Sequence, residues 1–248
     1  MIDTHAHLDA LDDADEAVAR AREAGVTRIL TVGTEPAGWS RALAFAEAYE
    51  GVYAILGVHP HGAADATDAD LEELRRLQAH PKAVAVGEIG LDWFRDYAPA
   101  EAQHRLFAAQ LELARELGKP VVIHTRAADD DTRAALLGHE GTVVLHCFGS
   151  PHLLPLALER GWYVSFAGNA TFPKATELRL AATEVPADRI LAETDTPYLA
   201  PQAVRGKRNE PAYVLHTLAG LAAARGEDPA DLEAQIERNA AACFNLPA

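Results

Sequence analysis

The sequence predicts a (β/α)8 barrel in which residues 1–248 form a single domain. Short apolar, β-branched runs alternate through the whole chain with longer segments rich in Ala, Leu, Glu and Arg, close to eight pairs. Runs such as residues 83–86 are apolar at every position, as in parallel strands that helices cover on both faces. Polar residues follow nearly every run, and in a barrel the strand ends meet at one mouth. A doubly wound sheet is the alternative fold. Such a sheet usually binds ligands at a single crevice, whereas here polar residues follow nearly every strand.

The elements follow from this alternation in chain order. The expected strands are residues 2–5, 28–32, 52–58, 83–87, 121–123, 142–145, 162–166 and 190–192. The expected helices are residues 14–24, 39–49, 68–79, 100–117, 129–137, 151–159, 174–182, 211–224 and 229–242. Thr67 can cap the helix at 68–79 by accepting a backbone N–H bond. Gly118 followed by Pro120 marks the end of the helix at 100–117, and the next strand begins at once.

Composition limits the class of protein. The hydrophobic fraction of 49% and the charged fraction of 24% are typical of a globular protein with a large core. The formal net charge of −15 argues against broad electrostatic capture of long nucleic acid, although a local basic patch is compatible with it. No signal peptide and no run of about 18 apolar residues is present. Only Cys147 and Cys243 occur, which fits reduced thiols. We expect a cytoplasmic monomer with no membrane partner.

Histidines and carboxylates directly follow the expected strands and predict a metal centre. Because alternate residues of a strand share one face, the first two histidines of the chain can converge on one ion. Six of the residues provide enough ligands for two divalent ions with a bridging carboxylate. Two ions about 3.5–4 Å apart can activate a hydroxide and stabilise a leaving oxygen. The six predicted metal ligands are His5, His7, Glu88, His124, His146 and Asp195.

Each of these residues also has a structural interpretation. A lone histidine such as His124 or His146 after a strand is often a core residue whose hydrogen bonds are satisfied. Asp195 could be a turn residue before Pro197. Glu88 is harder to explain in this way, since a carboxylate beside an apolar strand must be paired, hydrogen-bonded or metal-bound. We assign catalytic roles to Glu88 and Asp195, with Asp195 both a ligand and the general base.

Substrate contacts are predicted from two further segments. His59 and His61 flank Pro60 after the third strand. The two histidines either contact the substrate or are loop residues without a function. Residues 205–208 place three cations in four positions of an acidic chain. A solvated basic loop is the default interpretation. Its place after the eighth strand favours phosphate binding, for which the arginine fork is suited. The predicted substrate-binding residues are His59, Arg126, Arg205 and Arg208.

Taken together in this order, six segments resemble the TatD family of metal-dependent deoxyribonucleases over essentially the whole chain. They are residues 3–9 (DTHAHLD), 57–61 (GVHPH), 87–92 (GEIGLD), 122–126 (VIHTR), 146–148 (HCF) and 193–201 (ETDTPYLAP). The family's basic segment is also present as residues 205–211 (RGKRNEP). Two departures, Val204 where members often have histidine and Gly149-Ser150 where Ser-Gly is usual, affect substrate contacts rather than ligands.

The resemblance implies a ligand set and a reaction. It implies that His5, His7, Glu88 and Asp195 hold one ion, and that Glu88, His124 and His146 hold the other. It also implies hydrolysis of phosphodiester bonds in DNA. We therefore expect a nuclease that uses two divalent ions (Mg, Mn or Zn) and acts exonucleolytically on single-stranded or frayed ends. In this mechanism a metal-bound hydroxide attacks phosphorus and Asp195 takes the proton.

Two other functions compete with this one. The same ions could serve a hydrolase of small esters, amides or lactones, which the acidic net charge suits better than a long polyanion. A third interpretation makes the metals structural and the barrel a scaffold for partners. Structural zinc sites are usually closed, four-coordinate and rich in cysteine, whereas this set consists of histidines and carboxylates.

Overall fold

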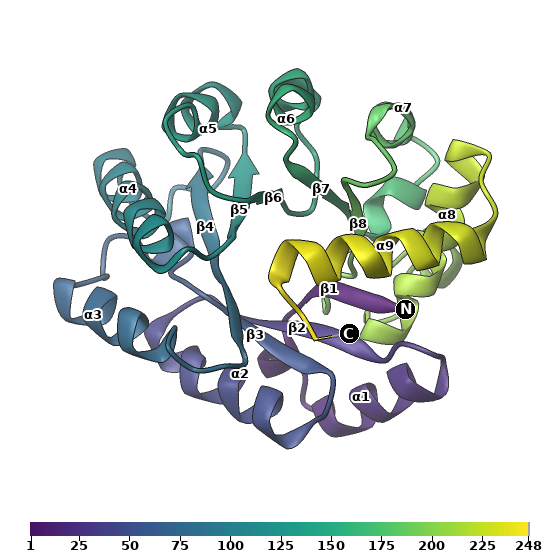
Figure 1. Ribbon diagram of the computed structural model, residues 1–248, viewed down its shortest axis with the longest axis horizontal. Coiled ribbons are helices and arrows are strands. Elements are labelled where there is room, and N and C mark those ends of the chain that lie inside the picture. The colour runs from purple at the N-terminus through teal and green to yellow at the C-terminus, as the bar shows by residue number, and fades with distance from the viewer. Residues whose placement is uncertain (248) are drawn as a thin grey trace.

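The computed structural model describes residues 1–247 and contains one sheet of eight parallel strands that follow one another in sequence order (Figure 1). Each strand pairs with the next in parallel orientation. The strands are β1 (Ile2–Ala6), β2 (Arg28–Gly33), β3 (Val52–Leu56), β4 (Ala83–Asp92), β5 (Val121–Arg126), β6 (Val143–Leu145), β7 (Tyr163–Phe166) and β8 (Ile190–Ala192). This order and the helices between the strands confirm the predicted (β/α)8 barrel.

Helices surround the strands on the outside (Figure 1). They are α1 (Ala14–Glu23), α2 (Pro36–Ala48), α3 (Asp68–Leu77), α4 (Ala100–Leu117), α5 (Asp129–Leu136), α6 (Leu154–Arg160), α7 (Thr176–Glu184), α8 (Val214–Arg225) and α9 (Pro229–Phe244). Short 3-10 turns begin at Pro151 and Pro211, so α6 and α8 start later than the sequence predicts. Proline fixes its own φ and lacks an N–H, which suits it to a first turn but does not set how the turn continues.

The barrel closes between its first and last strands. Ala6 forms an isolated parallel bridge with Thr196, and the backbone N–H of His7 donates to Thr196 O at 2.8 Å. One residue earlier, Asp195 N–H donates to His5 O at 2.9 Å. These bonds hold the segment after β8 against the end of β1. Two of the predicted ligand segments are therefore fixed side by side by backbone pairing.

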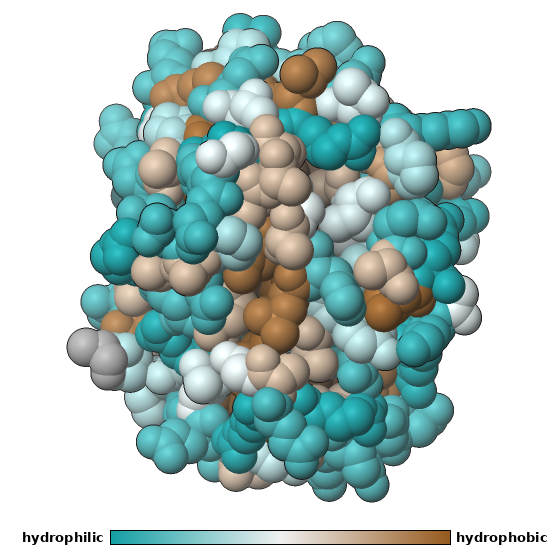
Figure 2. Space-filling view, turned by 90° about the vertical axis from the view of Figure 1, so that its right-hand side faces the viewer, coloured by the Kyte–Doolittle hydropathy of each residue, from teal (hydrophilic) through white to brown (hydrophobic). Residues whose placement is uncertain are grey.

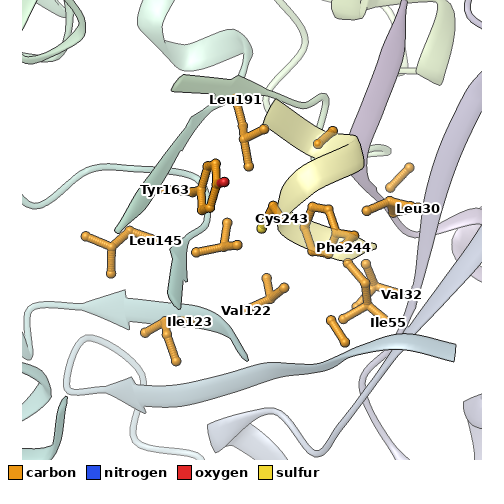
Figure 3. Packing of buried hydrophobic residues seen from close by; sticks show 14 of the residues in the cluster. Leu30, Val32, Ile55, Val122, Ile123, Leu145, Tyr163, Leu191, Cys243 and Phe244 are labelled. Carbon is orange, nitrogen blue, oxygen red and sulfur yellow. The ribbon is translucent and has the colours of Figure 1, made fainter. Parts of the chain in front are cut away.

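The end of the barrel opposite this junction is covered by α9. Met1 and Arg28, at the starts of β1 and β2, both pair with Glu237 of this helix. Figure 3 shows Cys243 and Phe244 of α9 among apolar residues of β2, β3, β7 and β8. Phe244 is 2% exposed, so it is part of the core. The N-terminal ends of the strands are thus covered by apolar packing, and polar residues accumulate at the other end.

The largest difference from the predicted elements concerns β4. The sequence predicts a strand that stops at Gly87, whereas β4 continues to Asp92 and is buried throughout. Its pairing with β5 shifts register between Gly87 and Ile89. Glu88 consequently lies within the strand, where it was expected just after it. Thr67 does cap α3, and forms a full capping box with Asp70.

The surface matches the acidic, polar composition. On the side of the molecule that lies to the right in Figure 1, most surface residues are hydrophilic, and the hydrophobic ones gather in a narrow central band with smaller patches at the top and right of the view (Figure 2). Within residues 1–247, no helix has both the length and the apolar character that crossing a membrane requires.

Candidate metal centre

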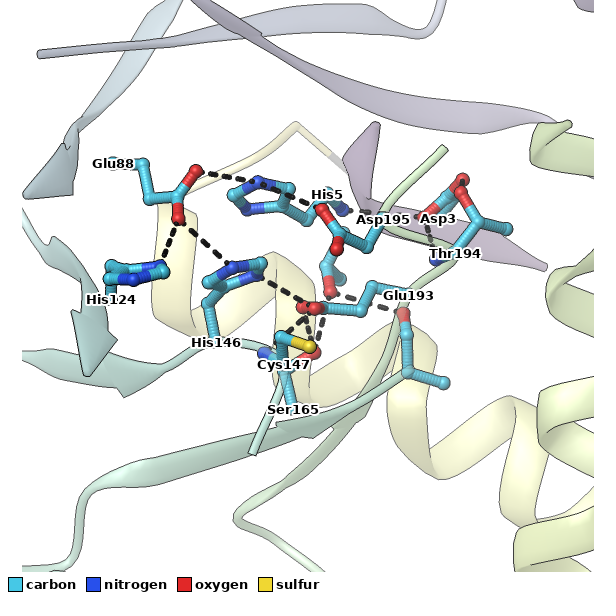
Figure 4. Close-up of polar contacts among 12 residues, drawn as sticks. Asp3, His5, Glu88, His124, His146, Cys147, Ser165, Glu193, Thr194 and Asp195 are labelled. Carbon is cyan, nitrogen blue, oxygen red and sulfur yellow. Dashed lines mark hydrogen bonds and ion pairs between the residues drawn. The ribbon is translucent and has the colours of Figure 1, made fainter. Parts of the chain in front are cut away.

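Glu88 lies at the centre of the cluster, and its two carboxylate oxygens face different groups (Figure 4). Oε1 is 2.8 Å from Nδ1 of His124 and 3.2 Å from Nε2 of His146. His124 belongs to β5 and His146 follows β6, so neighbouring strands supply both rings. We call His124 and His146 the Oε1 half of the site.

The other carboxylate oxygen faces the junction between the first and last strands. Oε2 is 3.5 Å from Nε2 of His5 and 3.8 Å from Nε2 of His7. The same ring of His7 lies 3.4 Å from Oδ1 of Asp195, which is 3.9 Å from Nε2 of His5. We call His5, His7 and Asp195 the Oε2 half. The structure brings all six predicted ligands into one cluster, with Glu88 between the two halves.

Second carboxylates fix the histidines of the Oε1 half. Nε2 of His124 is 3.3 Å from Oδ2 of Asp92, and Nδ1 of His146 is 2.8 Å from Oε1 of Glu193. The latter contact is close but not aligned as a hydrogen bond. A carboxylate on the far nitrogen of a ligating histidine is the usual means of fixing its tautomer and ring orientation. Each histidine of this half therefore presents its other nitrogen to Glu88.

Glu193 is itself anchored. Its Oε1 accepts from the backbone N–H of Cys147 at 2.8 Å, and its Oε2 accepts from the Ser165 hydroxyl at 2.5 Å. Behind the junction, Asp3 accepts from both the backbone N–H and the hydroxyl of Thr194 (Figure 4). These contacts link β1, β7 and the segment after β8 into one buried polar network, which holds the carboxylates in place.

The ionisation of the cluster reflects charge pairing that outweighs burial. Burial alone would lower the pKa of His146, but Glu193 and Glu88 raise it well above its usual value. Burial alone would raise the pKa of Glu88, but His146 and His59 lower it well below its usual range. The pKa of Asp195 is lowered in the same way, against burial, by His7 and His146. The carboxylates therefore stay ionised and require cationic partners.

His5 carries the observation that fits a metal ion best. Its ring is fully buried, and within residues 1–247 neither Nδ1 nor Nε2 has a hydrogen-bond partner. A buried nitrogen without a partner costs free energy, and a coordinated ion would remove that cost. His5 belongs to two groups of potential ligand atoms that lie within 4.8 Å of one another, one with His7 and Glu88 and one with His146 and Asp195. The residues present therefore fit divalent metal binding.

His59, a predicted substrate contact, lies beside the same cluster. Its Nε2 is 3.4 Å from Oε1 of Glu88, close enough to join a possible ligand group with His124. Its Nδ1, however, accepts a hydrogen bond from the backbone N–H of His61 at 3.1 Å. Burial lowers the pKa of His59 to about 4, so the ring is neutral and its single proton lies on Nε2. A protonated nitrogen can donate but cannot bind a metal, which suits contact with substrate.

The three arginines predicted to contact phosphate already have protein partners. Arg126 stacks on Phe94 with its guanidinium carbon 3.9 Å from the ring centre, and Arg205 stacks on Phe172 at the same distance. Arg208 donates to the backbone oxygen of Ala10 and lies 3.4 Å from Asp12. Stacking leaves the edge of a guanidinium free to donate. Arg126 and Arg205 are thus better placed for an anion than Arg208.

Sequence reasoning missed Asp92 and Glu193. For both residues the sequence contains a pattern that could have identified them. Asp92 is four residues from Glu88, so it shares its face once β4 is recognised as continuing through this segment. Glu193 directly follows the buried strand β8, which is the same signal that identified Glu88.

A parallel barrel with histidines and carboxylates grouped at the carboxyl ends of its strands defines the class of barrel-shaped metal-dependent hydrolases. Within that class the chain belongs to the TatD related DNase family, whose model matches residues 2–245. This membership confirms the predicted family and an enzyme of the metal-dependent nuclease type.

Several relatives match over nearly their full length. A Cronobacter sakazakii protein named 3'-5' ssDNA/RNA exonuclease TatD is 42% identical over 94% of this chain and 92% of its own. The Bacillus subtilis metal-dependent hydrolase YabD is 40% identical over 90% of both chains. The crystal structure of YJJV, a TatD homolog from Escherichia coli K12, superposes with a TM-score of 0.94 at 34% identity and covers 100% of this chain and 98% of that one.

Proposed function

We propose that this protein is a divalent-metal-dependent exonuclease that removes nucleotides from the 3' ends of single-stranded DNA or RNA. The observation that carries the proposal is the cluster around Glu88, in which one carboxylate contacts histidines on both of its oxygens. The direction of cleavage and the inclusion of RNA are taken from the relative named as a 3'-5' ssDNA/RNA exonuclease.

In this proposal the residues of the two halves would hold two divalent ions, Mg²⁺, Mn²⁺ or Zn²⁺. Such ions lower the pKa of water and offset the negative charge that develops on a phosphoryl group. Asp195 remains ionised because His7 and His146 keep its pKa low against the effect of burial, so a carboxylate oxygen can accept a proton from the attacking water. His59 donates from Nε2 to a phosphate oxygen.

Two arginines orient the substrate. Arg126 and Arg205 stand on phenylalanine rings in the segments that follow β4 and β7, and their exposed edges can donate to phosphate. The net charge of −15 favours contact with a few phosphates at one strand end over binding along a duplex. We further propose that residues 1–248 act as one domain, as a cytoplasmic monomer. The two free cysteines support the reducing compartment.

The test is cleavage of 3'- and 5'-labelled single-stranded oligonucleotides by protein of measured metal content. We expect stepwise shortening from the 3' end, abolished by chelator and restored by Mg²⁺ or Mn²⁺. Asp195→Asn should reduce cleavage by about 100-fold or more, the range of general acid-base catalysis. Cleavage that survives chelation, or an Asn variant as active as wild type, would overturn the mechanism.

A second pair of variants separates the nuclease from a hydrolase of small esters. Arg126→Gln with Arg205→Gln should weaken cleavage of oligonucleotides while leaving turnover of a small phosphodiester, bis(p-nitrophenyl) phosphate, nearly unchanged. Arg238→Gln, at an exposed position of α9 at the opposite end of the barrel, is the control for loss of a positive charge. Equal loss on both substrates would contradict the role of the two arginines.

A further inference from the structure

Exposed aromatic side chains collect at the mouth of the barrel. Among residues 1–247, five large hydrophobic side chains are exposed, and the three aromatic ones all follow strands that build the site. Phe94 and Tyr97 come after β4, at 58% and 62% exposure, and Tyr198 comes after β8, at 59%. The other two, Leu137 and Leu180, lie on or beside the outer helices α5 and α7. Exposed rings are therefore concentrated where the substrate must enter.

The two tyrosines lie next to different sides of the metal centre. Tyr97 packs at right angles to His61, with ring centres 4.7 Å apart, and His61 shares Asp92 with His124 of the Oε1 half. Tyr198 packs almost at right angles to His7 of the Oε2 half, with ring centres 6.1 Å apart. In a perpendicular pair the edge of one ring faces the other ring, so the contact covers only part of each ring. Each tyrosine thus keeps a large exposed surface beside its half of the site.

Both tyrosines stand on segments that polar contacts hold in place. Before Tyr97, the backbone N–H groups of Phe94 and Arg95 donate to Asp92 Oδ1 at 2.8 and 2.9 Å. Tyr198 N–H donates to Asp195 O at 2.8 Å, and Asn209 donates to Tyr198 O. Rings that are exposed and yet held lose little conformational entropy when a ligand packs on them. This combination suits a binding surface.

We propose that Tyr97 and Tyr198 are stacking positions for nucleobases on the two sides of the scissile phosphate. The inference rests on the proposed nuclease function and adds a determinant of substrate class. Bases of a single strand have free faces, and stacking on an aromatic ring stabilises them without regard to sequence. Bases inside a duplex are already stacked and paired, so they cannot use these positions. The tyrosines therefore favour single strands and strand ends of any sequence.

The experiment measures binding by metal-loaded protein to a phosphorothioate oligonucleotide, which resists hydrolysis and carries 2-aminopurine at its last two positions, so that one probe lies on each side of the scissile phosphate. Tyr97→Ala and Tyr198→Ala should each weaken binding about tenfold, equivalent to about 1.4 kcal/mol. Each should also relieve part of the fluorescence quenching that stacking causes. Tyr97→Phe and Tyr198→Phe should bind like wild type, because phenylalanine keeps the ring. Leu180→Ala removes an exposed side chain on α7 and serves as the control.

An oligonucleotide of equal length with abasic sites at its 3' end distinguishes stacking from a change in protein structure. Wild type and both alanine variants should bind it equally. The proposal is overturned if the alanine variants keep wild-type affinity for the base-containing strand, or if they lose as much affinity for the abasic one. If wild type cleaves the strand and the alanine variants bind it as tightly as wild type, the stacking role is overturned and the nuclease proposal is not. Wild type that neither binds nor cleaves the unmodified strand would overturn the nuclease proposal as well.

Discussion

The two halves of the metal centre are held in different ways. In the Oε1 half, Asp92 and Glu193 contact the far nitrogens of His124 and His146. In the Oε2 half, His5 has no hydrogen-bond partner on either nitrogen within residues 1–247, and its nearest carboxylate oxygens are 3.5 and 3.9 Å away. His124 of the Oε1 half is thus oriented by protein hydrogen bonds on both nitrogens, and His146 by close carboxylates. The Oε2 half has its ligands in place but lacks the polar partner that an ion would supply.

The largest effect is expected from the residue that the two halves share. Glu88→Gln removes the charge that both oxygens present to the histidines, so neither half keeps its ligand set. We expect kcat/KM on a single-stranded oligonucleotide to fall at least about 1,000-fold, which corresponds to about 4 kcal/mol. Metal content by mass spectrometry should fall for both ions. A variant that loses one ion and keeps the other would show that Glu88 belongs to one half only.

Replacing one histidine in each half should change stability in opposite directions when a chelator is present. His124→Leu removes one hydrogen-bond partner from each of the buried carboxylates of Glu88 and Asp92 and should destabilise the protein by about 2 kcal/mol. His5→Leu removes two buried nitrogens without partners and should leave stability equal or higher. Denaturant unfolding followed by circular dichroism measures both. Equal losses would mean that the halves are held alike.

Glu193→Gln tests the orientation of the Oε1 half. Loss of a carboxylate behind a ligating histidine typically weakens metal affinity by about 10- to 100-fold. We expect titration calorimetry to show that the affinity for one ion falls about 10-fold and that the affinity for the other ion does not change. Glu184→Gln replaces an exposed carboxylate at the C-terminal end of α7, far from the mouth of the barrel, and should change neither affinity. Weakening of both ions by Glu193→Gln would contradict a separate Oε1 half.

The smallest effect is expected far from both halves and gives a baseline for the stability measurements. Thr67→Ala removes the cap of α3 and should cost about 1 kcal/mol. Hydrogen bonds from Thr67 lower the pKa of Asp70, so this contribution is present above the ordinary carboxyl pKa and is lost as pH falls through the lowered value. The difference between variant and wild type should shrink in acid. Metal content and cleavage at neutral pH should not change.

The sequence predicted the barrel and the members of the cluster because both follow from short-range patterns. Apolar runs marked the strands, and a carboxylate beside such a run must be paired, hydrogen-bonded or metal-bound, whereas the histidines indicated a site only as a set. The extent of β4 was not predictable in this way, since Gly87 and Gly90 interrupt the apolar pattern while pairing with β5 continues to Asp92. Without that continuation, Asp92 could not be placed beside His124.

Partners supplied by distant segments were also out of reach. Residues 205–208 were interpreted as a basic loop that binds phosphate, yet Arg208 lies against Asp12 and Ala10 from the segment after β1. The role of Glu193 depends on Cys147 and Ser165, which precede it by 46 and 28 residues. Sequence spacing gives the faces of strands but not the rotation of rings, so only the structure shows that His59 Nδ1 accepts from the backbone N–H of His61.

The hydrogen bonds that join residues 5 and 7 to residues 195 and 196 make the site a late product of synthesis and folding. Until β8 and the segment after it pair with β1, Asp195 is not beside His7 and the Oε2 half does not exist. A chain still attached to a ribosome has its first strand exposed long before its last one is made. The metal centre is therefore incomplete until the barrel closes, because only then do the ligands from the two ends of the chain meet.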